Sequence, residues 1–362
     1  MKILIIGPFP DPIFGVSLSN SVLYNGLKQA RVKVTKIDTA VRGSIDSKVG
    51  GWNLNKLAVI KSYFKLYKVF GSDVIYCTSG QTFFGILKYA PFVWLAALLR
   101  KPAVVHIKGG FLRTSYENMS PLKKKISKSV LAKYRTGIVL SKSLKPLLEG
   151  FIPEKRIFIQ HNFIQDALLQ PSEKILSKKN FKALNIIYLS NLMITKGIED
   201  LLDALEILSQ QGVTFEAKIA GNIPKGHNYL LTRMNQLPGV SYLGVVKNVK
   251  KSDLLSWGNV FCLPTYYDME GQPISILEAM GFGNLIVTTA HAGIPDICNQ
   301  DNSAFVHKKD PKDIARVLIE LSKMPDRVEA ICRHNLKQAQ ERYTEEAFIS
   351  GIESILKQTT NC

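Results

Sequence analysis

Short apolar runs alternate along this chain with longer stretches that have the hydrophobic period of a helix. In the first half, β-branched runs occupy 3–6, 32–37, 73–77, 103–107, 137–140 and 157–160, with helix-like stretches such as 17–29 and 121–134 between them. Strands separated by helices of this length need crossover connections. The pattern therefore predicts an α/β fold built on a parallel sheet.

A polar stretch, "QPSEKILSKKNFK" at 170–182, interrupts this alternation. The alternation then restarts, with apolar runs at 185–190, 214–221, 240–244, 259–264 and 284–289. A chain of 362 residues exceeds what one hydrophobic core usually holds, so two domains are expected. We predict an N-terminal domain over 1–165, a linker over 166–182 and a second wound domain over 183–344.

Composition narrows the class of protein. With 46% hydrophobic and 21% charged residues the chain is globular. Its five cysteines are far apart and show no ligand spacing, which predicts reduced thiols and no metal site. The start, "MKILIIGPFP", is interpreted as a first strand and not as a signal peptide. The most apolar window, 83–99, is broken by Lys88 and Pro91 and is shorter than the roughly 20 residues of a membrane span.

The positive charge of the chain is concentrated in its first half. Residues 1–165 hold 26 of the 47 Lys and Arg residues but only 7 of the 29 Asp and Glu residues. Two stretches, 54–70 and 121–135, read as basic amphipathic helices; the first carries Lys61, Lys65 and Lys68 on one side. Such an excess indicates a polyanionic partner, either an anionic membrane surface or nucleic acid, although a solvated charged face would explain either helix alone.

Five loops that follow predicted strands contain Gly, Pro or an isolated polar residue, as ligand-lining loops do. They are 7–15, 108–110, 190–197, 221–224 and 264–273. Ligands of open parallel sheets bind beyond the carboxyl ends of the strands. Ordinary turn chemistry accounts for any one of these loops, but their joint placement favours a binding site.

The stretch "EGQPISILEAMG" at 270–281 carries the most specific chemistry. A strand runs into a loop with Gly271 and Pro273, and a helical pattern follows that includes Glu278. Free amides in the first turn of that helix would bind an anion such as a diphosphate. Glu278, one turn further on, could accept hydrogen bonds from two sugar hydroxyls, and Glu270 would face another part of the same ligand.

This block, "LPTYYDMEGQPISILEAMGFGNLIVTTAHAGIPDI", resembles the signature of retaining glycosyltransferases of family 4, in which two glutamates are separated by seven residues. The resemblance extends to "YLSNLMITKGIEDLLDAL" at 188–205 and "AGNIP" at 220–224, and covers nearly the whole chain. It implies the GT-B fold: two facing Rossmann-like, doubly wound domains with an interdomain cleft. It also implies that a final helix, within 345–362, returns to the first domain.

The resemblance assigns roles to individual residues. Glu278 would hold the ribose hydroxyls of a nucleotide-sugar donor, and Lys196 would contact its diphosphate, although a solvated lysine before a helix is the alternative for Lys196. Gly15 would let the first loop approach the donor phosphates, and Asn162 would open the connection between domains. Glu270 would hold the transferred hexose together with the backbone of four residues that follow it, Gly271, Gln272, Pro273 and Ile274.

Two positions depart from the family pattern. Asn191 stands where the family usually has an arginine for the diphosphate, and Lys108 stands where a histidine is expected, with His106 two residues before it. We hypothesise that Lys108, from the facing domain, supplies the cation that Asn191 does not. Contact with solvent or acceptor is the alternative for Lys108, and a hydrogen-bonded core histidine is the alternative for His106.

The implied activity is transfer of a hexosyl group, with retention of configuration, from a UDP- or GDP-linked donor without metal or cofactor. The acceptor would be a glycan or a lipid-linked glycan of surface polysaccharide assembly, reached by a cytoplasmic enzyme docked on the inner face of the cell membrane. Alternatives are a sugar-nucleotide epimerase or an inverting transferase of the same fold. A nucleic-acid-binding protein is a further alternative, but RNP, KH and zinc-finger patterns are absent from the sequence.

Overall fold

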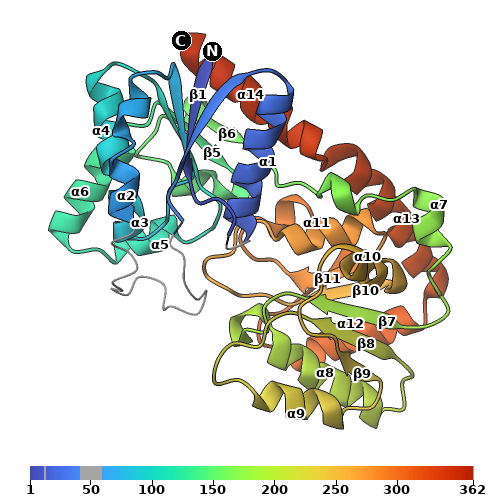
Figure 1. The fold of residues 1–362 in the computed structure, drawn as a ribbon. Coiled ribbons are helices and arrows are strands. Elements are labelled where there is room, and N and C mark those ends of the chain that lie inside the picture. Colours follow the sequence, from blue (N-terminus) through green and yellow to red (C-terminus); the bar gives the residue numbers. More distant parts are fainter. Residues whose placement is uncertain (12–13, 41–58, 362) are drawn as a thin grey trace. The chain divides into compact units, whose positions relative to one another are not determined.

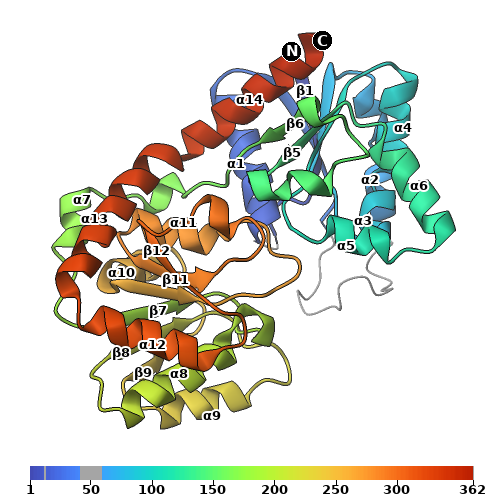
Figure 2. The ribbon, with the colours of Figure 1, turned by 180° about the vertical axis from the view of Figure 1, so that it is seen from behind.

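The computed structural model describes residues 1–11, 14–40 and 59–361. The chain divides into two compact units, one formed by Met1–Asn162 with Glu345–Cys362 and the other by Phe163–Thr344. Each unit contains one parallel β-sheet with helices packed on it (Figures 1 and 2), so the predicted α/β class is confirmed.

The first unit is built on a six-stranded sheet in the order β2-β1-β3-β4-β5-β6. Each predicted strand of this half is present, with ends that differ by one or two residues. The strands are β1 (Lys2–Gly7), β2 (Lys33–Asp38), β3 (Val74–Cys77), β4 (Ala103–His106), β5 (Thr136–Val139) and β6 (Ile157–Ile159). The apolar side chains of β1, β3 and β4 are almost wholly buried, which is why these strands read as continuous hydrophobic runs.

Helices and 3-10 turns connect these strands. They are α1 (Gly15–Gln29), α2 (Ile60–Tyr63), η2 (Leu66–Val69), α3 (Phe83–Leu87), α4 (Ala90–Leu98), α5 (Leu112–Glu117), α6 (Pro121–Leu131), η3 (Lys142–Leu147) and η4 (Glu154–Arg156). The last helix of the chain, α14 (Glu345–Asn361), packs on α1, because Gly26 has no side chain to displace Ile349. Thr359 on α14 also donates a hydrogen bond to Thr136 of β5 at 3.0 Å.

The basic stretch 54–70 does not form one helix in its described part. Residues 59–70 form the short helix α2 and the turn η2, so the prediction of a continuous amphipathic helix is wrong there; residues 54–58 lie outside the described residues. The Ser62 hydroxyl donates to the carbonyl of Val59 at 2.6 Å, a local bond of the kind that competes with helix formation. Seven of the other residues of 59–70 are aromatic or β-branched, and such residues favour helices only weakly.

The second unit is built on a six-stranded sheet in the order β12-β11-β10-β7-β8-β9. Its strands are β7 (Asn185–Leu189), β8 (Glu216–Ala220), β9 (Val240–Tyr242), β10 (Val260–Leu263), β11 (Leu285–Thr289) and β12 (Ser303–Val306). The short strand β12 is an addition to the predicted set. The chain fills one half of the sheet from β7 outward and then the other half from β10 outward. Strand order therefore reverses between β7 and β10, and this is where doubly wound sheets bind ligands.

Helices cover both faces of this second sheet (Figures 1 and 2). They are α7 (Ser172–Leu176), α8 (Ile198–Gln210), α9 (Tyr229–Gln236), α10 (Asn248–Trp257), α11 (Ile274–Gly281), α12 (Pro311–Ser322) and α13 (Pro325–Arg342), with the turns η5 (Asp166–Leu168), η6 (Ile194–Lys196) and η7 (Ile294–Asp296). Segment 166–182, expected as a linker, contains η5 and α7, and Leu168 and Ile175 are buried in the core of this unit.

Within the described ranges, no helix is both long enough and apolar enough to cross a bilayer.

Candidate active site

The loops that follow β7 and β10 lie in contact where strand order reverses. The backbone N–H of Tyr266 donates to the carbonyl of Thr195 at 2.8 Å and so ties the two loops together. Gly197 has a φ of 75°, which is left-handed, and forms the N-cap of α8. A Cβ at Gly197 would lie 2.4 Å from the carbonyl oxygen of Pro264, so this close approach requires glycine.

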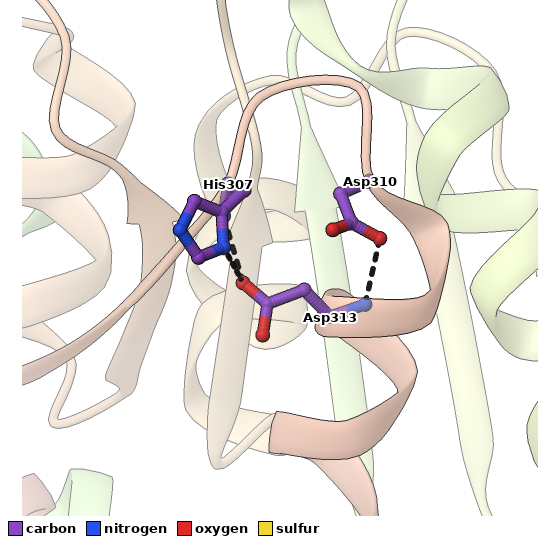
Figure 3. A group of neighbouring side chains, drawn as sticks. All are labelled: His307, Asp310 and Asp313. Atoms are coloured by element: carbon purple, nitrogen blue, oxygen red, sulfur yellow. Dashed lines mark hydrogen bonds and ion pairs between the residues drawn. The ribbon is translucent and has the colours of Figure 1, made fainter.

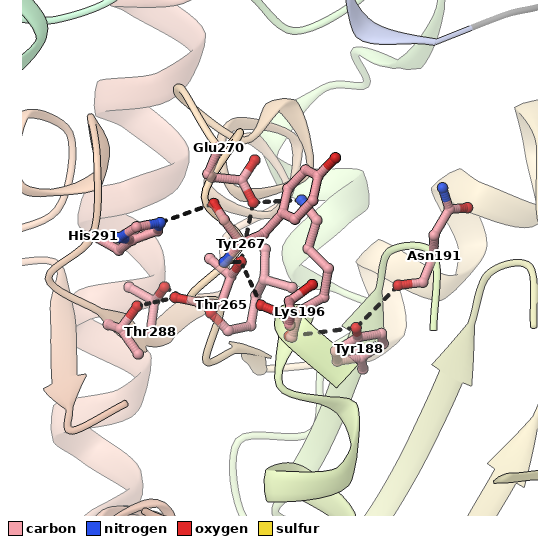
Figure 4. Close-up of polar contacts among 11 residues, drawn as sticks. Tyr188, Asn191, Lys196, Thr265, Tyr267, Glu270, Thr288 and His291 are labelled. Carbon is pink, nitrogen blue, oxygen red and sulfur yellow. Dashed lines mark hydrogen bonds and ion pairs between the residues drawn. The ribbon is translucent and has the colours of Figure 1, made fainter. Parts of the chain in front are cut away.

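Lys196 and Glu270 form an ion pair between these two loops (Figure 4). Their side chains are 14% and 9% exposed, respectively. The Thr265 hydroxyl donates to the same Glu270 oxygen at 3.1 Å. The Lys196 ammonium lies 4.9 Å from the centroid of the Tyr267 ring. The structure thus brings together two residues that the sequence placed in one site, and it adds Thr265 and Tyr267 as neighbours.

Hydrogen bonds from His291 and Thr288, which lie on and after β11, also hold the loop that follows β10. Nε2 of His291 lies 2.9 Å from the carbonyl oxygen of Tyr267, and Nδ1 lies 2.9 Å from the ammonium of Lys308. A carbonyl oxygen can only accept, so Nε2 carries the proton and Nδ1 accepts from Lys308. The Thr288 hydroxyl donates to the carbonyl of Leu263 at 2.8 Å. These bonds fix the backbone that carries Glu270 (Figure 4).

Glu278 is the second acidic residue of the motif and is almost fully buried on α11, with 2% of its side chain exposed. Its Oε1 forms an ion pair and hydrogen bond with Lys251 of α10. Burial raises the pKa of Glu278, and the neighbouring Lys251 ammonium opposes that rise. Residues 276, 277, 279 and 280 on either side of Glu278 are fully buried and apolar. A carboxylate in such surroundings points to a function, because it contributes little to stability.

The other predicted donor-binding residues lie in or beside these loops. Pro273 is the N-cap residue of α11 and Ile274 is its first residue. Gln272 is buried, and the carbonyl of Gly271 accepts a hydrogen bond from the N–H of Gly293 at 2.8 Å. The backbone carbonyl of Asn191 accepts a hydrogen bond from the hydroxyl of Tyr188 at 3.3 Å, and its side chain is exposed (Figure 4).

Four predicted residues belong to the first unit: Gly15, His106, Lys108 and Asn162. Gly15 is the first residue of α1. His106, at the end of β4, is fully buried, and its Nδ1 lies 2.7 Å from the Tyr76 hydroxyl. Its Nε2 has no hydrogen-bond partner in the described part of the chain. Burial, and to a lesser extent the Lys108 charge, lowers the pKa of His106 well below its usual value, so the ring is neutral.

The Lys108 ammonium donates to Oδ1 of Asn162 at 3.2 Å and lies 4.6 Å from the centroid of the Phe348 ring. Burial lowers its pKa well below the ordinary lysine value. An anionic ligand beside Lys108 would oppose this shift and favour the charged form. Its compensating role for Asn191 stays a prediction.

His307, Asp310 and Asp313 bring three potential metal ligands together at the start of α12 (Figure 3). Asp310 accepts a hydrogen bond from the N–H of Asp313 and is the N-cap residue of the helix. Asp313 also pairs with Arg316 and with His307. A helix cap and its local ion pairs account for the whole group.

These features describe two parallel α/β units, the second of which has a Lys and Glu pair beyond the carboxyl ends of the central strands of its sheet. Residues 183–324, most of that second unit, match the family model described as glycosyl transferases group 1. This part of the chain is therefore similar in sequence to group 1 glycosyltransferases.

Two curated relatives are also described as glycosyltransferases, and one solved structure shares the fold. The putative colanic acid biosynthesis glycosyltransferase WcaL of Escherichia coli (strain K12) is 27% identical over 187 residues, 48% of this chain and 45% of the relative. The amylovoran biosynthesis glycosyltransferase AmsK of Erwinia amylovora is 28% identical over 166 residues, 44% of this chain and 38% of the relative. The crystal structure of Anabaena HepE in complex with UDP has a TM-score of 0.73 and 15% identity, with 99% of this chain and 100% of that chain covered.

The chain thus spans less than half the length of these curated relatives. The similarity to HepE confirms the GT-B fold over nearly the whole chain, and the sequence matches confirm the glycosyltransferase resemblance in the second unit. Three residues of the site carried no distinguishing sequence signal: Lys251 is one of two adjacent lysines on a helix, and Tyr267 and His291 are single residues in loops.

Proposed function

We propose that this protein is a retaining glycosyltransferase that moves a hexosyl group from a nucleotide-sugar donor to a glycan or lipid-linked glycan acceptor. The observation that carries the proposal is the Lys196 and Glu270 pair at the strand-order reversal of the group 1 domain. The named relatives are glycosyltransferases of polysaccharide biosynthesis. They favour transfer, in surface polysaccharide assembly, over the epimerase alternative.

The donor is UDP- or GDP-linked, and HepE was crystallised with UDP. In the proposed complex the donor diphosphate replaces Glu270 as the ion-pair partner of Lys196, because a diphosphate carries more negative charge than one carboxylate. Glu270, still hydrogen-bonded to Thr265, then turns one oxygen to a hydroxyl of the hexose. Glu278 accepts hydrogen bonds from the ribose.

In the proposed reaction the bond between the anomeric carbon and the diphosphate breaks as the acceptor oxygen attacks the same face of the sugar. The leaving phosphate oxygen takes the proton of the acceptor hydroxyl. Lys196 and the amides of the first turn of α11 neutralise the charge that develops on the diphosphate. Glu270 orients and stabilises the hexose without forming a covalent bond, and the cationic side chain and helix terminus do the work that a metal ion does in other transferases.

Donor binding can be tested with a panel of UDP-glucose, UDP-galactose, UDP-N-acetylglucosamine and GDP-mannose against the purified chain. A ligand at one hundred times its dissociation constant raises the free energy of unfolding by about 2.7 kcal/mol, which a thermal shift detects. For the donor that binds, transfer is followed by release of nucleoside diphosphate, with and without EDTA, and by NMR of the anomeric configuration. Lys196→Met and Glu270→Gln should each lower turnover at least about 100-fold, whereas the exposed control Lys323→Met should leave it unchanged. Binding of none of the four donors, or inversion at the anomeric carbon, would reject the respective part of the proposal.

We further propose that the first unit docks on an anionic membrane surface at the cytoplasmic face. The basic residues of α6, Lys123, Lys124, Lys125 and Lys128, have no carboxylate partner among the described residues. Large apolar side chains stand exposed on the neighbouring elements α2, η2, α4 and α6: Ile60, Phe64, Tyr67, Phe70, Trp94, Leu98 and Leu122. Helix α4 contacts both η2 and α6. Apolar side chains among lysines suit the boundary between headgroups and acyl chains, with each charge contributing about 1 kcal/mol.

Co-sedimentation with phosphatidylcholine vesicles, with and without phosphatidylglycerol, tests this docking. Phe64 and Leu98 are each 79% exposed, so Phe64→Ser and Leu98→Ser together should weaken binding to anionic vesicles without unfolding the chain. The control Val249→Ser changes an apolar residue of the second unit that is 72% exposed. Equal binding to neutral and anionic vesicles would contradict docking on an anionic surface, and salt-sensitive binding to oligonucleotides without vesicle binding would favour the nucleic-acid alternative.

A further inference from the structure

Glu278 belongs to the proposed donor site, and its ion-pair partner Lys251 lies outside the motif that identified Glu278. Lys251 comes from α10 and reaches Oε1 of Glu278 on α11. Its side chain is 19% exposed, whereas that of Glu278 is 2% exposed. The second carboxylate oxygen of Glu278 has no hydrogen-bond partner in the described part of the chain. One oxygen is therefore held and the other is available.

A held carboxylate with one available oxygen is suited to recognising a neutral hydroxyl group. Ionised carboxylates accept hydrogen bonds and do not donate them, so Glu278 must be ionised to receive hydroxyl protons. Full burial alone favours the protonated form, and an ammonium in direct contact favours the ionised form. An ion pair also fixes the torsion angles of the glutamate side chain, which reduces the entropy lost when a ligand binds.

We propose that Lys251 is a positioning residue for the ribose of the donor, acting through Glu278 by holding one of its oxygens and leaving the other to the ribose hydroxyls. This inference rests on the proposed function, because it takes a nucleoside diphosphate as the ligand of Glu278. Lys251 does not touch the reacting atoms. Its effect is confined to affinity for ligands that carry ribose hydroxyls, and it leaves the transfer step unchanged.

The test compares UDP and GDP with their 2′,3′-dideoxy forms by isothermal titration. Lys251→Met should weaken binding of the ribonucleotide at least about tenfold, the loss expected for a hydrogen bond to a charged group. Binding of the dideoxynucleotide, which offers Glu278 no hydroxyl, should change less than about twofold. Lys251→Arg keeps the cation and should recover most of the affinity. In turnover, Lys251→Met should raise KM for the donor and leave kcat within about twofold.

The adjacent Lys250 supplies a matched control, because it is exposed on the same helix and forms no ion pair with a described residue. Lys250→Met removes the same charge and should not change either affinity. Thermal unfolding of every variant separates loss of fold from loss of recognition, and the combination of Lys251→Met with Glu278→Gln should be no weaker for UDP than Glu278→Gln alone.

Each outcome has one meaning. Equal losses for ribonucleotide and dideoxynucleotide, or no loss for either, would overturn the role of Lys251 while the parent chain still binds UDP or GDP. If the parent chain binds neither nucleotide, the proposed function itself fails, and the inference about Lys251 fails with it.

Discussion

Gly197 is the point where the loop bearing Lys196 touches the loop that leads to Glu270, and its replacement by alanine gives the sharpest test of this geometry. Two effects contribute. The left-handed backbone, with a φ of 75°, costs a residue with a Cβ about 1–2 kcal/mol. The Cβ would also lie 2.4 Å from the oxygen and 2.6 Å from Cγ of Pro264. Backbone and a proline ring cannot rotate away, so relief requires a shift of the loops, at about 1–3 kcal/mol.

Gly212 isolates the first effect, the cost of the left-handed backbone. It lies just beyond the other end of the same helix, α8, with a φ of 69°, and a Cβ there would have no neighbour within 4 Å. Gly212→Ala should therefore lower the free energy of unfolding by about 1–2 kcal/mol, the backbone cost alone. Gly197→Ala should lower it by about 2–5 kcal/mol, the sum of both costs.

Urea denaturation of the two variants measures this difference, and titration with the donor nucleotide measures its effect on the site. Gly197→Ala should weaken nucleotide binding because it separates Lys196 from Glu270, whereas Gly212→Ala should not. The reasoning is refuted if both variants lose the same stability, or if Gly197→Ala binds nucleotide as the parent chain does.

Three further predictions concern stability. Lys251→Met should lower the free energy of unfolding by about 1–3 kcal/mol because it leaves the buried carboxylate of Glu278 unpaired, and adding Glu278→Met should recover most of that loss in urea denaturation; no recovery would contradict it. Asp310→Ala should cost about 0.5–2 kcal/mol by removing the N-cap of α12, and Asp310→Asn, which keeps an acceptor, should cost less in the same assay. Burial lowers the pKa of Lys179 to about 8 from its ordinary 10.5. The unfolded chain then binds more protons than the folded chain between these pH values, so the Lys179 contribution to the free energy of unfolding should rise from pH 8 to pH 10. Thermal melts of the parent chain and of Lys179→Met across this range measure that contribution. Melting temperatures of the two chains that change in parallel with pH would contradict the prediction.

Much of the fold could be predicted from the sequence, because local hydrophobic patterns identify most of its strands. The β-branched runs predicted eleven of the strands to within a few residues, since strands buried on both faces must be continuously apolar. The strand β12 was missed because "SAFV" at 303–306 contains only two residues of strand-favouring type, Phe305 and Val306. The prediction of one amphipathic helix was wrong over 59–70 because a charge pattern with helical spacing carries no information about backbone propensity.

For the site, the sequence supplied the residue types and the structure supplied their partners. Glu270, Glu278 and Lys196 could be named from their motifs and from the loops that carry them. Nothing in the sequence indicated that Lys196 pairs with Glu270, 74 residues later, or that Lys251 pairs with Glu278, because both pairs join side chains from different βα units.

The sequence by itself therefore determined the fold class, the uneven distribution of charge and the identity of the two motif glutamates, since composition and short-range spacing encode all three. Only the tertiary structure decided which cation each glutamate meets and which glycine lets the loops touch. These depend on the order of strands in the sheet, which brings β7 next to β10 and is fixed by packing between segments far apart in the chain.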